Sequence, residues 1–315
     1  MINTRFFQVL LACFVSCTAY ASSDFYPDFL TLSKPMFSEQ PDIPACRAGR
    51  LQDEQIQQAL DTLNDIRKLH QLAPVTLNPL TEQESNQAAL MVAANGKLDH
   101  HPTESWRCFS AIGAKAMAKS LLIGGVTAPN IAFHTPAQDI SAWLTDHTAQ
   151  TSDGIGHRRW MLDPFIGQIS YGRVSGKTDG RNVSVGSALA FNSGKFKPVT
   201  GPELIAYPFH DYPSRFFSRK ALLSFSLLID KQRKPGNSAV DFSQARISVV
   251  NERGESLRVR NVRFDNHYFG LPNNLQFGLD DIQQGVRYDI QVDAVKVQGL
   301  EKSYRYWFRI VPDSQ

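Results

Sequence analysis

The residues with the clearest chemical potential lie in one short stretch, Gly154–Pro164, which reads GIGHRRWMLDP. It places His157, Arg158 and Arg159 directly after two glycines, and glycine tolerates the positive backbone angles that turn a loop sharply toward a site. Pro164 then ends any short helix or turn that forms here. A histidine held in this way can ligate a metal, transfer a proton or fill a hydrogen-bonding position in a core. Each role makes a different demand on the neighbouring elements.

The composition indicates an ordinary globular protein. The chain has 315 residues, of which 42% are hydrophobic and 20% are charged, and this length suits two domains. The formal net charge of +3 is too small to favour nucleic acid or an acidic membrane surface as a partner. We therefore expect no nucleic-acid partner.

Residues 1–21 have the pattern of a signal peptide. A short basic region precedes an apolar run over Phe6–Val15, and Ala19–Ala21 is an A-x-A cleavage signal. No later segment holds the ~20 apolar residues that a transmembrane helix needs. The sequence thus predicts an exported protein, periplasmic or secreted, without a transmembrane segment. Lipid anchoring at Cys17 is the alternative, although Phe14 is a poor first residue for a lipobox.

Cleavage after Ala21 would leave two cysteines, Cys46 and Cys108. Two cysteines in an oxidising compartment most simply form one disulfide, and two free buried thiols are the alternative. Nothing near either residue marks an activated thiolate, which argues against a cysteine nucleophile.

The first half of the chain after the leader predicts helices. Four prolines in residues 22–50 indicate an extended N-terminal arm. Apolar spacing and capping signals then mark four segments. The expected helices run from Gln52 to His70, from a capping box at Thr81–Glu84 to a stop at Gly96, from Phe109 to Gly124, and from a capping box at Thr135 through Trp143.

After Pro164 the apolar pattern alternates. Gln168–Val174 and Val183–Phe191 are expected to be antiparallel strands, so residues 51–195 form an α+β domain. Glycines and prolines in residues 192–202 indicate a linker, and residues 203–315 are expected to form an all-β, immunoglobulin-like sandwich. The strand-like runs there are Leu222–Ile229, Ala245–Val250, Leu257–Val262, Val286–Val292 and Tyr304–Val311.

Several motifs occur in an order that resembles the CAP superfamily, also called SCP or cysteine-rich secretory proteins, and especially its bacterial members. The resemblance covers roughly residues 50–192 and implies an α-β-α sandwich with an open cleft containing two histidines. The C-terminal region is similar to the β-sandwich that follows some bacterial CAP domains. The motifs are Asn64-Asp65-Ile66-Arg67, Gly96-Lys97-Leu98-Asp99-His100, Asn130-Ile131-Ala132, Trp143 and Gly156-His157-Arg158.

Position by position, the resemblance makes His100 and His157 the two cleft histidines. In many family members two acidic residues complete a tetrad that holds a divalent cation, often zinc. Here Ala128-Pro129-Asn130 replaces the usual Gly-Glu-Asn, so one glutamate is missing, and Asp146 could stand in for the second acid. His100, His157 and Asp146 would together be enough ligands for an open zinc site.

The predicted cleft or ligand-binding residues are His100, His157, Arg158 and Asn130. Of Arg158 and Arg159, we expect one to pair with a carboxylate inside the CAP-like domain and the other to line the cleft. The favoured function is binding of a small ligand, divalent cation or partner without catalysis.

A hydrolase or peptidase that uses His157 and water, with or without a metal, is the alternative function. The chain has neither a His-Glu-x-x-His helix nor a Gly-x-Ser-x-Gly elbow, although Ser110 and Ser152 stay open as nucleophiles. A structural role in the cell envelope is a third hypothesis.

Overall fold

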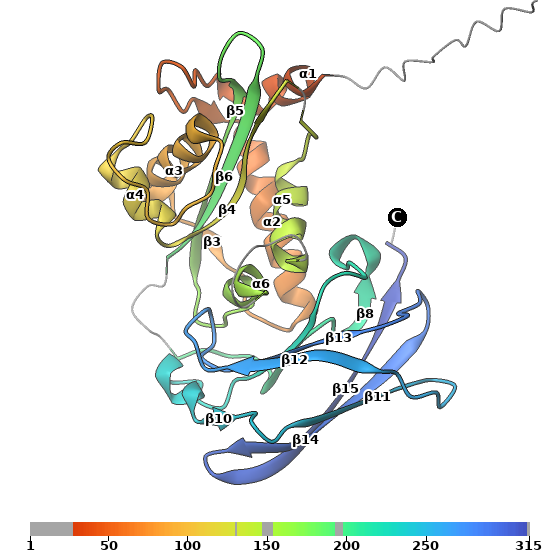
Figure 1. Cartoon of the computed structure of the whole chain (residues 1–315). Coiled ribbons are helices and arrows are strands. Elements are labelled where there is room, and N and C mark those ends of the chain that lie inside the picture. The colour runs from red at the N-terminus through yellow and green to blue at the C-terminus, as the bar shows by residue number, and fades with distance from the viewer. Residues whose placement is uncertain (1–27, 130, 147–153, 193–197, 314–315) are drawn as a thin grey trace, which may run out of the picture.

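The computed structural model describes residues 28–129, 131–146, 154–192 and 198–313. It has two lobes, an upper one in which helices cover a β-sheet and a lower one made of two further sheets (Figure 1). Within the described ranges no helix is both long and apolar enough to cross a membrane. The predicted signal peptide and Cys17 lie outside these ranges.

The upper lobe begins with short elements in the segment expected to be an extended arm. Helix α1 (Phe29–Ser33) leads through a 3-10 turn into strand β1 (Phe37–Glu39), which pairs antiparallel with β2 (Arg50–Leu51). Helix α2 (Asp53–Leu69) follows and confirms the helix predicted from apolar spacing. It buries the apolar stripe against the sheet and α5, as an amphipathic helix should.

Helix α3 (Glu82–Asn95) ends as predicted, because Gly96 takes the left-handed conformation with φ 59°. The capping box predicted at Thr81–Glu84 is wrong. Thr81 is the last residue of a 3-10 turn, Pro79–Thr81, which takes its cap from the Asn78 side chain. Nine of the fourteen residues of α3 are buried, so it is a central helix rather than an amphipathic one.

The helix expected from Phe109 to Gly124 is only partly correct. Helix α4 (Ala111–Met117) stops early, and β4 (Ser120–Ala128) replaces the rest. The apolar residues of that segment pair along β6, and a bulge at Gly124 and Gly125 accommodates them. Helix α5 (Pro136–Thr145) does have its predicted capping box, formed by Thr135 and Gln138.

The upper sheet has the strand order β3-β5-β6-β4. It consists of β3 (Thr76–Leu77), β4, β5 (Gln168–Lys177) and β6 (Val183–Asn192), and confirms the predicted β5–β6 hairpin. Helix α3 packs closely on one face, since a Cβ on Gly172 would lie 2.4 Å from the Ser85 carbonyl carbon. Helix α5 covers the other face, where Asp139 accepts hydrogen bonds from Tyr171, Arg173 and Ser187.

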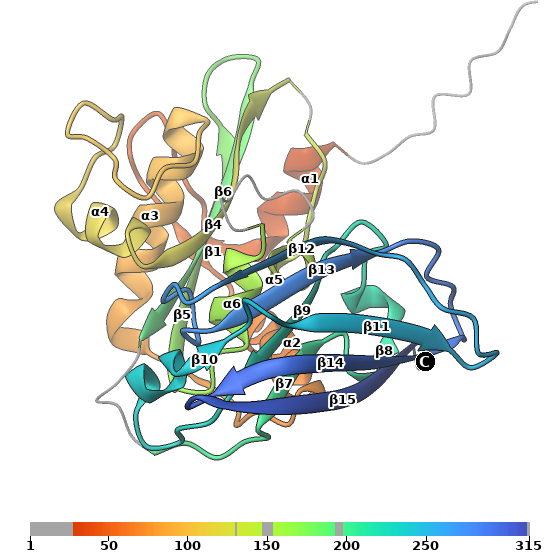
Figure 2. The same ribbon diagram turned by 60° about the horizontal axis from the view of Figure 1, so that its bottom comes forward.

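The lower lobe contains two sheets, whose strands are labelled in Figure 2. One has the order β10-β14-β15-β8 with β11 on β14, and the other has the order β12-β13-β9-β7. An aromatic core that includes Phe225 stacked on Tyr306 lies between them. The strands are β7 (Leu204–Tyr207), β8 (His210–Pro213), β9 (Leu223–Leu227), β10 (Val240–Asp241), β11 (Arg246–Asn251), β12 (Val259–Asp265), β13 (Asn274–Leu279), β14 (Arg287–Val297) and β15 (Leu300–Val311).

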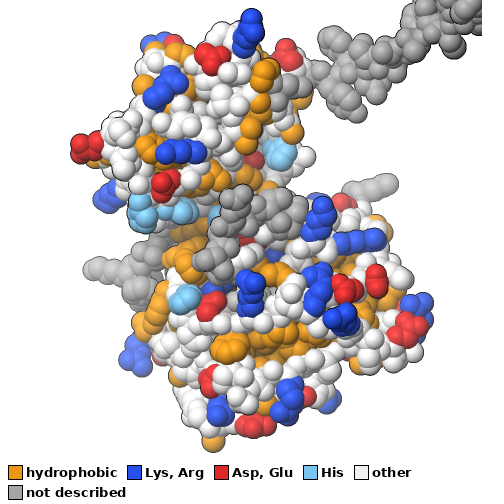
Figure 3. Space-filling view, viewed as in Figure 1, with side chains coloured by type: hydrophobic (Ala, Val, Ile, Leu, Met, Phe, Trp, Pro, Cys, Tyr) orange, Lys and Arg blue, Asp and Glu red, His pale blue; other side chains and the backbone are white. Residues whose placement is uncertain are grey.

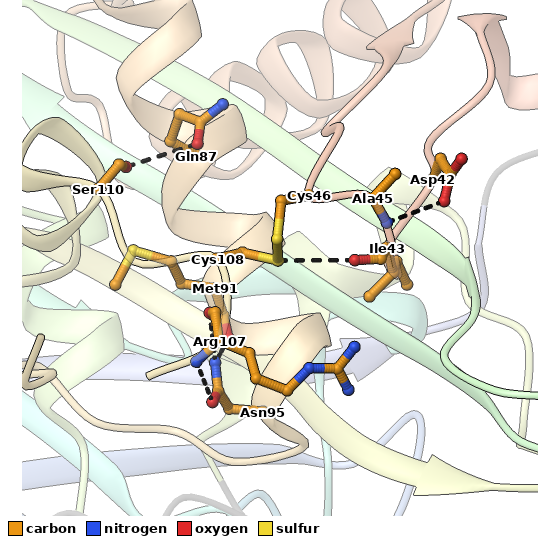
Figure 4. Close-up of a disulfide and its surroundings, with 10 residues drawn as sticks. All are labelled: Asp42, Ile43, Ala45, Cys46, Gln87, Met91, Asn95, Arg107, Cys108 and Ser110. Carbon is orange, nitrogen blue, oxygen red and sulfur yellow. Dashed lines mark hydrogen bonds between the residues drawn. A yellow bond between two sulfur atoms is a disulfide. The ribbon is translucent and has the colours of Figure 1, made fainter. Parts of the chain in front are cut away.

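A disulfide joins Cys46 to Cys108, as predicted (Figure 4). It ties the segment before α2 to the loop that precedes α4. On the α4 side, Asn95 at the end of α3 holds the same loop, donating to the Arg107 carbonyl and accepting from the Arg107 N–H.

Removing this disulfide should destabilise the protein. The bridge spans 62 residues, so the Cys46→Ser, Cys108→Ser double variant should lose about 2–4 kcal/mol of unfolding free energy, because the unfolded chain regains loop entropy. Urea unfolding followed by tryptophan fluorescence measures the loss. Wild type treated with reductant is the matched control and should give the same midpoint as the variant. Equal midpoints for oxidised and reduced wild type would contradict the prediction.

Candidate functional site

Asp146 and His157 form the centre of the candidate site. Helix α5 ends at Asp146, which takes a left-handed conformation with φ 54°. This turn brings the carboxylate to the start of helix α6 (Gly156–Met161). One oxygen, Oδ2, accepts the backbone N–H groups of His157 and Arg158 at 3.0 and 3.3 Å, and Oδ1 lies 2.8 Å from His157 Nδ1. The acid therefore fixes both the backbone and the ring of His157.

The hydrogen bonding assigns the His157 tautomer. The Asp146 side chain is wholly buried and already accepts two backbone N–H groups, so its remaining oxygen acts as an acceptor toward the ring. Nδ1 then carries a proton, so the neutral ring has its lone pair on Nε2. The His157 side chain is 15% exposed, so one edge of the ring is accessible. The pair is thus an oriented imidazole with a free basic nitrogen.

His100, the other predicted cleft histidine, lies in the exposed loop after α3. Its Nδ1 is 2.7 Å from the Met117 carbonyl oxygen and donates to it, and Nε2 has no hydrogen-bond partner among the described residues. Histidine side chains gather along the margin of the upper lobe that faces the lower lobe (Figure 3).

The three predicted zinc ligands do not assemble. Among the described residues no three His, Cys, Asp or Glu side chains lie together as a metal-binding group. Asp146 uses its oxygens on N–H donors and serves as the partner of His157. The residues in place therefore do not fit a three-ligand zinc site.

Three other predicted residues have different outcomes. Asn130, a predicted cleft residue, and Ser152, a possible nucleophile, lie outside the described residues. Ser110, the other possible nucleophile, is the N-cap of α4, and its Oγ accepts the Gly113 N–H at 3.1 Å. This is a helix-capping role.

Arg158 is completely buried rather than lining an open cleft. Its guanidinium donates to the carbonyls of Leu144, Thr145 and Leu222 at 2.7, 2.9 and 2.6 Å. It also lies 3.8 Å from the centre of the Tyr207 ring. Burial lowers the pKa of Arg158. Since Leu144 and Thr145 belong to α5 whereas Leu222 precedes β9, this one side chain joins the two lobes.

Arg159 makes the second connection. Its guanidinium donates to both oxygens of Asp265, at 2.9 and 3.0 Å, and to the His267 carbonyl. The predicted carboxylate partner is thus real, but it belongs to β12 in the lower lobe. Gly270 has φ 75° and approaches so closely that a Cβ there would lie 2.0 Å from the Arg159 carbonyl oxygen.

Two buried groups that the sequence did not single out also lie between the lobes. Lys234 donates to Asp163 at 2.5 Å and sits 4.7 Å above the Trp160 ring. His70, at the end of α2, lies 3.0 Å from the Tyr212 hydroxyl. Burial, reinforced by the nearby Arg158 and Arg67, lowers the pKa of His70 to about 3. His70 is therefore neutral in the folded protein at ordinary pH.

Residues 60–187 match the family model described as cysteine-rich secretory protein family, or CAP. The match supports a CAP domain in this part of the chain, which contains Asp146, His157 and most of the sheet that supports them. A search of curated proteins found no match to the chain.

Proposed function

We propose that the protein is an exported CAP-domain protein of the bacterial type that binds a small molecule or partner through His157, without catalysis. The observation that carries this is the buried Asp146 carboxylate, which holds His157 by Nδ1, while Nε2 has no partner among the described residues. A neutral imidazole presented in this way accepts a hydrogen bond. The ligand should therefore offer an O–H or N–H group to His157.

The supporting features agree with this role. The leader-like residues 1–21 and the Cys46–Cys108 bridge favour an exported protein. The two-sheet lower lobe, with its aromatic core, favours an immunoglobulin-like sandwich that anchors the CAP domain.

Ligand-observed NMR tests the proposal. A library of small sugars, amino acids and peptides is screened against the wild type, His157→Ala and Asp146→Asn. Ligands of the site should lose their signal with His157→Ala and bind about tenfold more weakly to Asp146→Asn, because an asparagine amide cannot accept from the ring and both backbone N–H groups. His134→Ala, an exposed histidine, is the control. Hits that bind all variants equally would argue against a His157 site.

Hydrolysis is the second candidate, and the same hydrogen bond favours it. A carboxylate that orients an imidazole is the arrangement of a general base, which here would take a proton from water. Turnover of a nitrophenyl ester or peptide substrate should then vanish in His157→Ala. Turnover that survives this substitution would come from another source.

Cation binding is tested separately, by titrating the purified protein with zinc. Because no three such side chains come together among the described residues, and Asp146 is engaged by N–H donors, we expect no stoichiometric zinc binding. Tight binding of one zinc, lost in the His100→Ala, His157→Ala double variant, would instead show that the two histidines ligate the metal.

A further inference from the structure

A second concave site lies at the opposite end of the CAP sheet. It is a pocket of about 720 Å³ between α1, the segment after β4 and the β5–β6 hairpin. Strand β5 begins at Gln168, shortly after α6, and ends at Lys177 beside this pocket. Nine residue steps along a strand span roughly 30 Å. The pocket is therefore separate from the Asp146–His157 site, as the positions of α1 and α6 in Figure 1 show.

The floor of the pocket is apolar. Phe29 on α1 is 3% exposed and meets Phe133 edge to face, with ring centres 6.3 Å apart. Val183 of β6 is also buried, whereas Leu32 at the mouth is 38% exposed. Figure 3 shows hydrophobic side chains reaching the surface of the upper lobe in a strip. An apolar hollow of this size, within the roughly 300–1,000 Å³ range of ligand pockets, suits a small molecule.

One side of the pocket is cationic. Lys177 and Arg181 both line it from the β5–β6 hairpin, and neither forms an ion pair with any described residue. Asp28 is the one carboxylate among the described lining residues, and its Oδ1 accepts the Thr31 N–H at the start of α1. The lining thus carries a net positive charge beside an aromatic floor.

The sheet beneath the pocket also holds polar groups. Ser175 lies two residues before Lys177 on the same face of β5, and its buried Oγ has no hydrogen-bond partner in the described part of the protein. The buried Arg173 guanidinium lies 6.0 Å from the centre of the Phe133 ring. Unpaired buried hydroxyls are rare in folded proteins.

We propose that this pocket binds a small amphipathic organic anion. Its apolar body would contact Phe29 and Phe133, and its acidic group would lie between Lys177 and Arg181, where charge-assisted hydrogen bonds form. Concavity and the pairing of an apolar floor with two unpaired cations favour this ligand over a protein partner, which needs roughly 800 Å² of complementary surface on each side.

Two fluorescent probes with nearly the same aromatic body separate the two halves of the proposal. Anilinonaphthalene sulfonate carries an anionic group, and N-phenylnaphthylamine lacks it. Wild type should bind one sulfonate probe saturably and bind the neutral probe at least tenfold more weakly. The Lys177→Gln, Arg181→Gln variant should weaken the sulfonate probe about tenfold and the neutral probe less than twofold. Ile131→Glu, at the mouth, should weaken both probes.

The control variant removes the same number of positive charges at a site far from the pocket. Lys220→Gln with Lys302→Gln removes two exposed cations from the lower lobe and should leave both affinities unchanged. Thermal unfolding of each variant confirms that the fold is intact. An equal loss with the control pair would show a general charge effect and overturn the proposal. So would equal binding of the two probes, binding that Ile131→Glu leaves intact, or no saturable binding of the sulfonate probe.

Discussion

Replacing Arg158 by methionine is expected to lower the free energy of unfolding by about 3–5 kcal/mol. The substitution removes the donors to the carbonyls of Leu144, Thr145 and Leu222, and methionine cannot replace them. Those oxygens lie in a buried interface, where an unsatisfied acceptor costs about 1–3 kcal/mol. Loss of the stacking on Tyr207 adds to the effect.

Urea unfolding of the Arg158→Met variant measures this loss. Arg309→Met is the matched control, because Arg309 pairs with Asp211 on the surface, where both side chains are more than 40% exposed. Exposed pairs contribute about 0–1 kcal/mol. Equal destabilisation by the two substitutions would show that Arg158 has no special role at the interface.

Acid should destabilise the protein through His70. The pKa of His70 is lowered to about 3 in the fold, against about 6.5 in an unfolded chain. Between these values the unfolded state binds a proton that the folded state does not. Stability from this group is thus complete above pH 6.5 and falls as the pH drops toward 3. The loss is about 1.4 kcal/mol per pH unit, or roughly 3 kcal/mol between pH 7 and pH 4.

His70→Gln isolates this contribution, because glutamine keeps a polar group near Tyr212 but does not titrate. The difference in unfolding free energy between wild type and variant should shrink as the pH falls from 7 to 4. Carboxylates titrate equally in both proteins and cancel in that difference. A difference that stays constant with pH would mean that His70 is protonated in the folded protein.

Sequence signals predict a helix end correctly where a single residue type determines the backbone conformation at that end. Gly96 ends α3 because it adopts the left-handed conformation at little cost, and Thr135 with Gln138 begins α5. The apolar run from Ser120 is predicted as helix but forms a strand. Periodicity cannot separate the two, because a short apolar run fits a buried helix and a buried strand equally well. Only its pairing with β6 decides the outcome, and that contact is far away in sequence.

Strands with both faces buried were also missed. In β13 all six residues are buried, including Asn274 and Gln276, so no alternation marks the strand. One face of this sheet packs on its partner sheet and the other lies toward the CAP domain. Burial on both faces removes the alternating pattern by which a strand is predicted from a single sequence.

The site was half predictable. The glycine-flanked loop singles out His157, which lies beside Asp146 in the structure. The resemblance suggests Asp146 as a metal ligand, because sequence spacing does not give the direction in which a carboxylate points. A left-handed aspartate at a helix end turns that carboxylate onto α6. Likewise, the partners of Arg158 and Arg159 in the lower lobe, Leu222 and Asp265, lie more than 60 residues away.

Helix α6 has a consequence for how such a protein can be rebuilt. Its side chains serve both lobes: His157 lies beside Asp146, Arg158 and Arg159 reach groups of the lower lobe, and Met161 is in the core. A fragment ending after β6 would keep His157, but Arg158 would lose the Leu222 carbonyl and Arg159 would lose Asp265 and the His267 carbonyl. The CAP domain therefore cannot be exchanged between proteins on its own. Domain swaps with other CAP proteins should succeed only where α6 and the loops that receive its arginines are exchanged together.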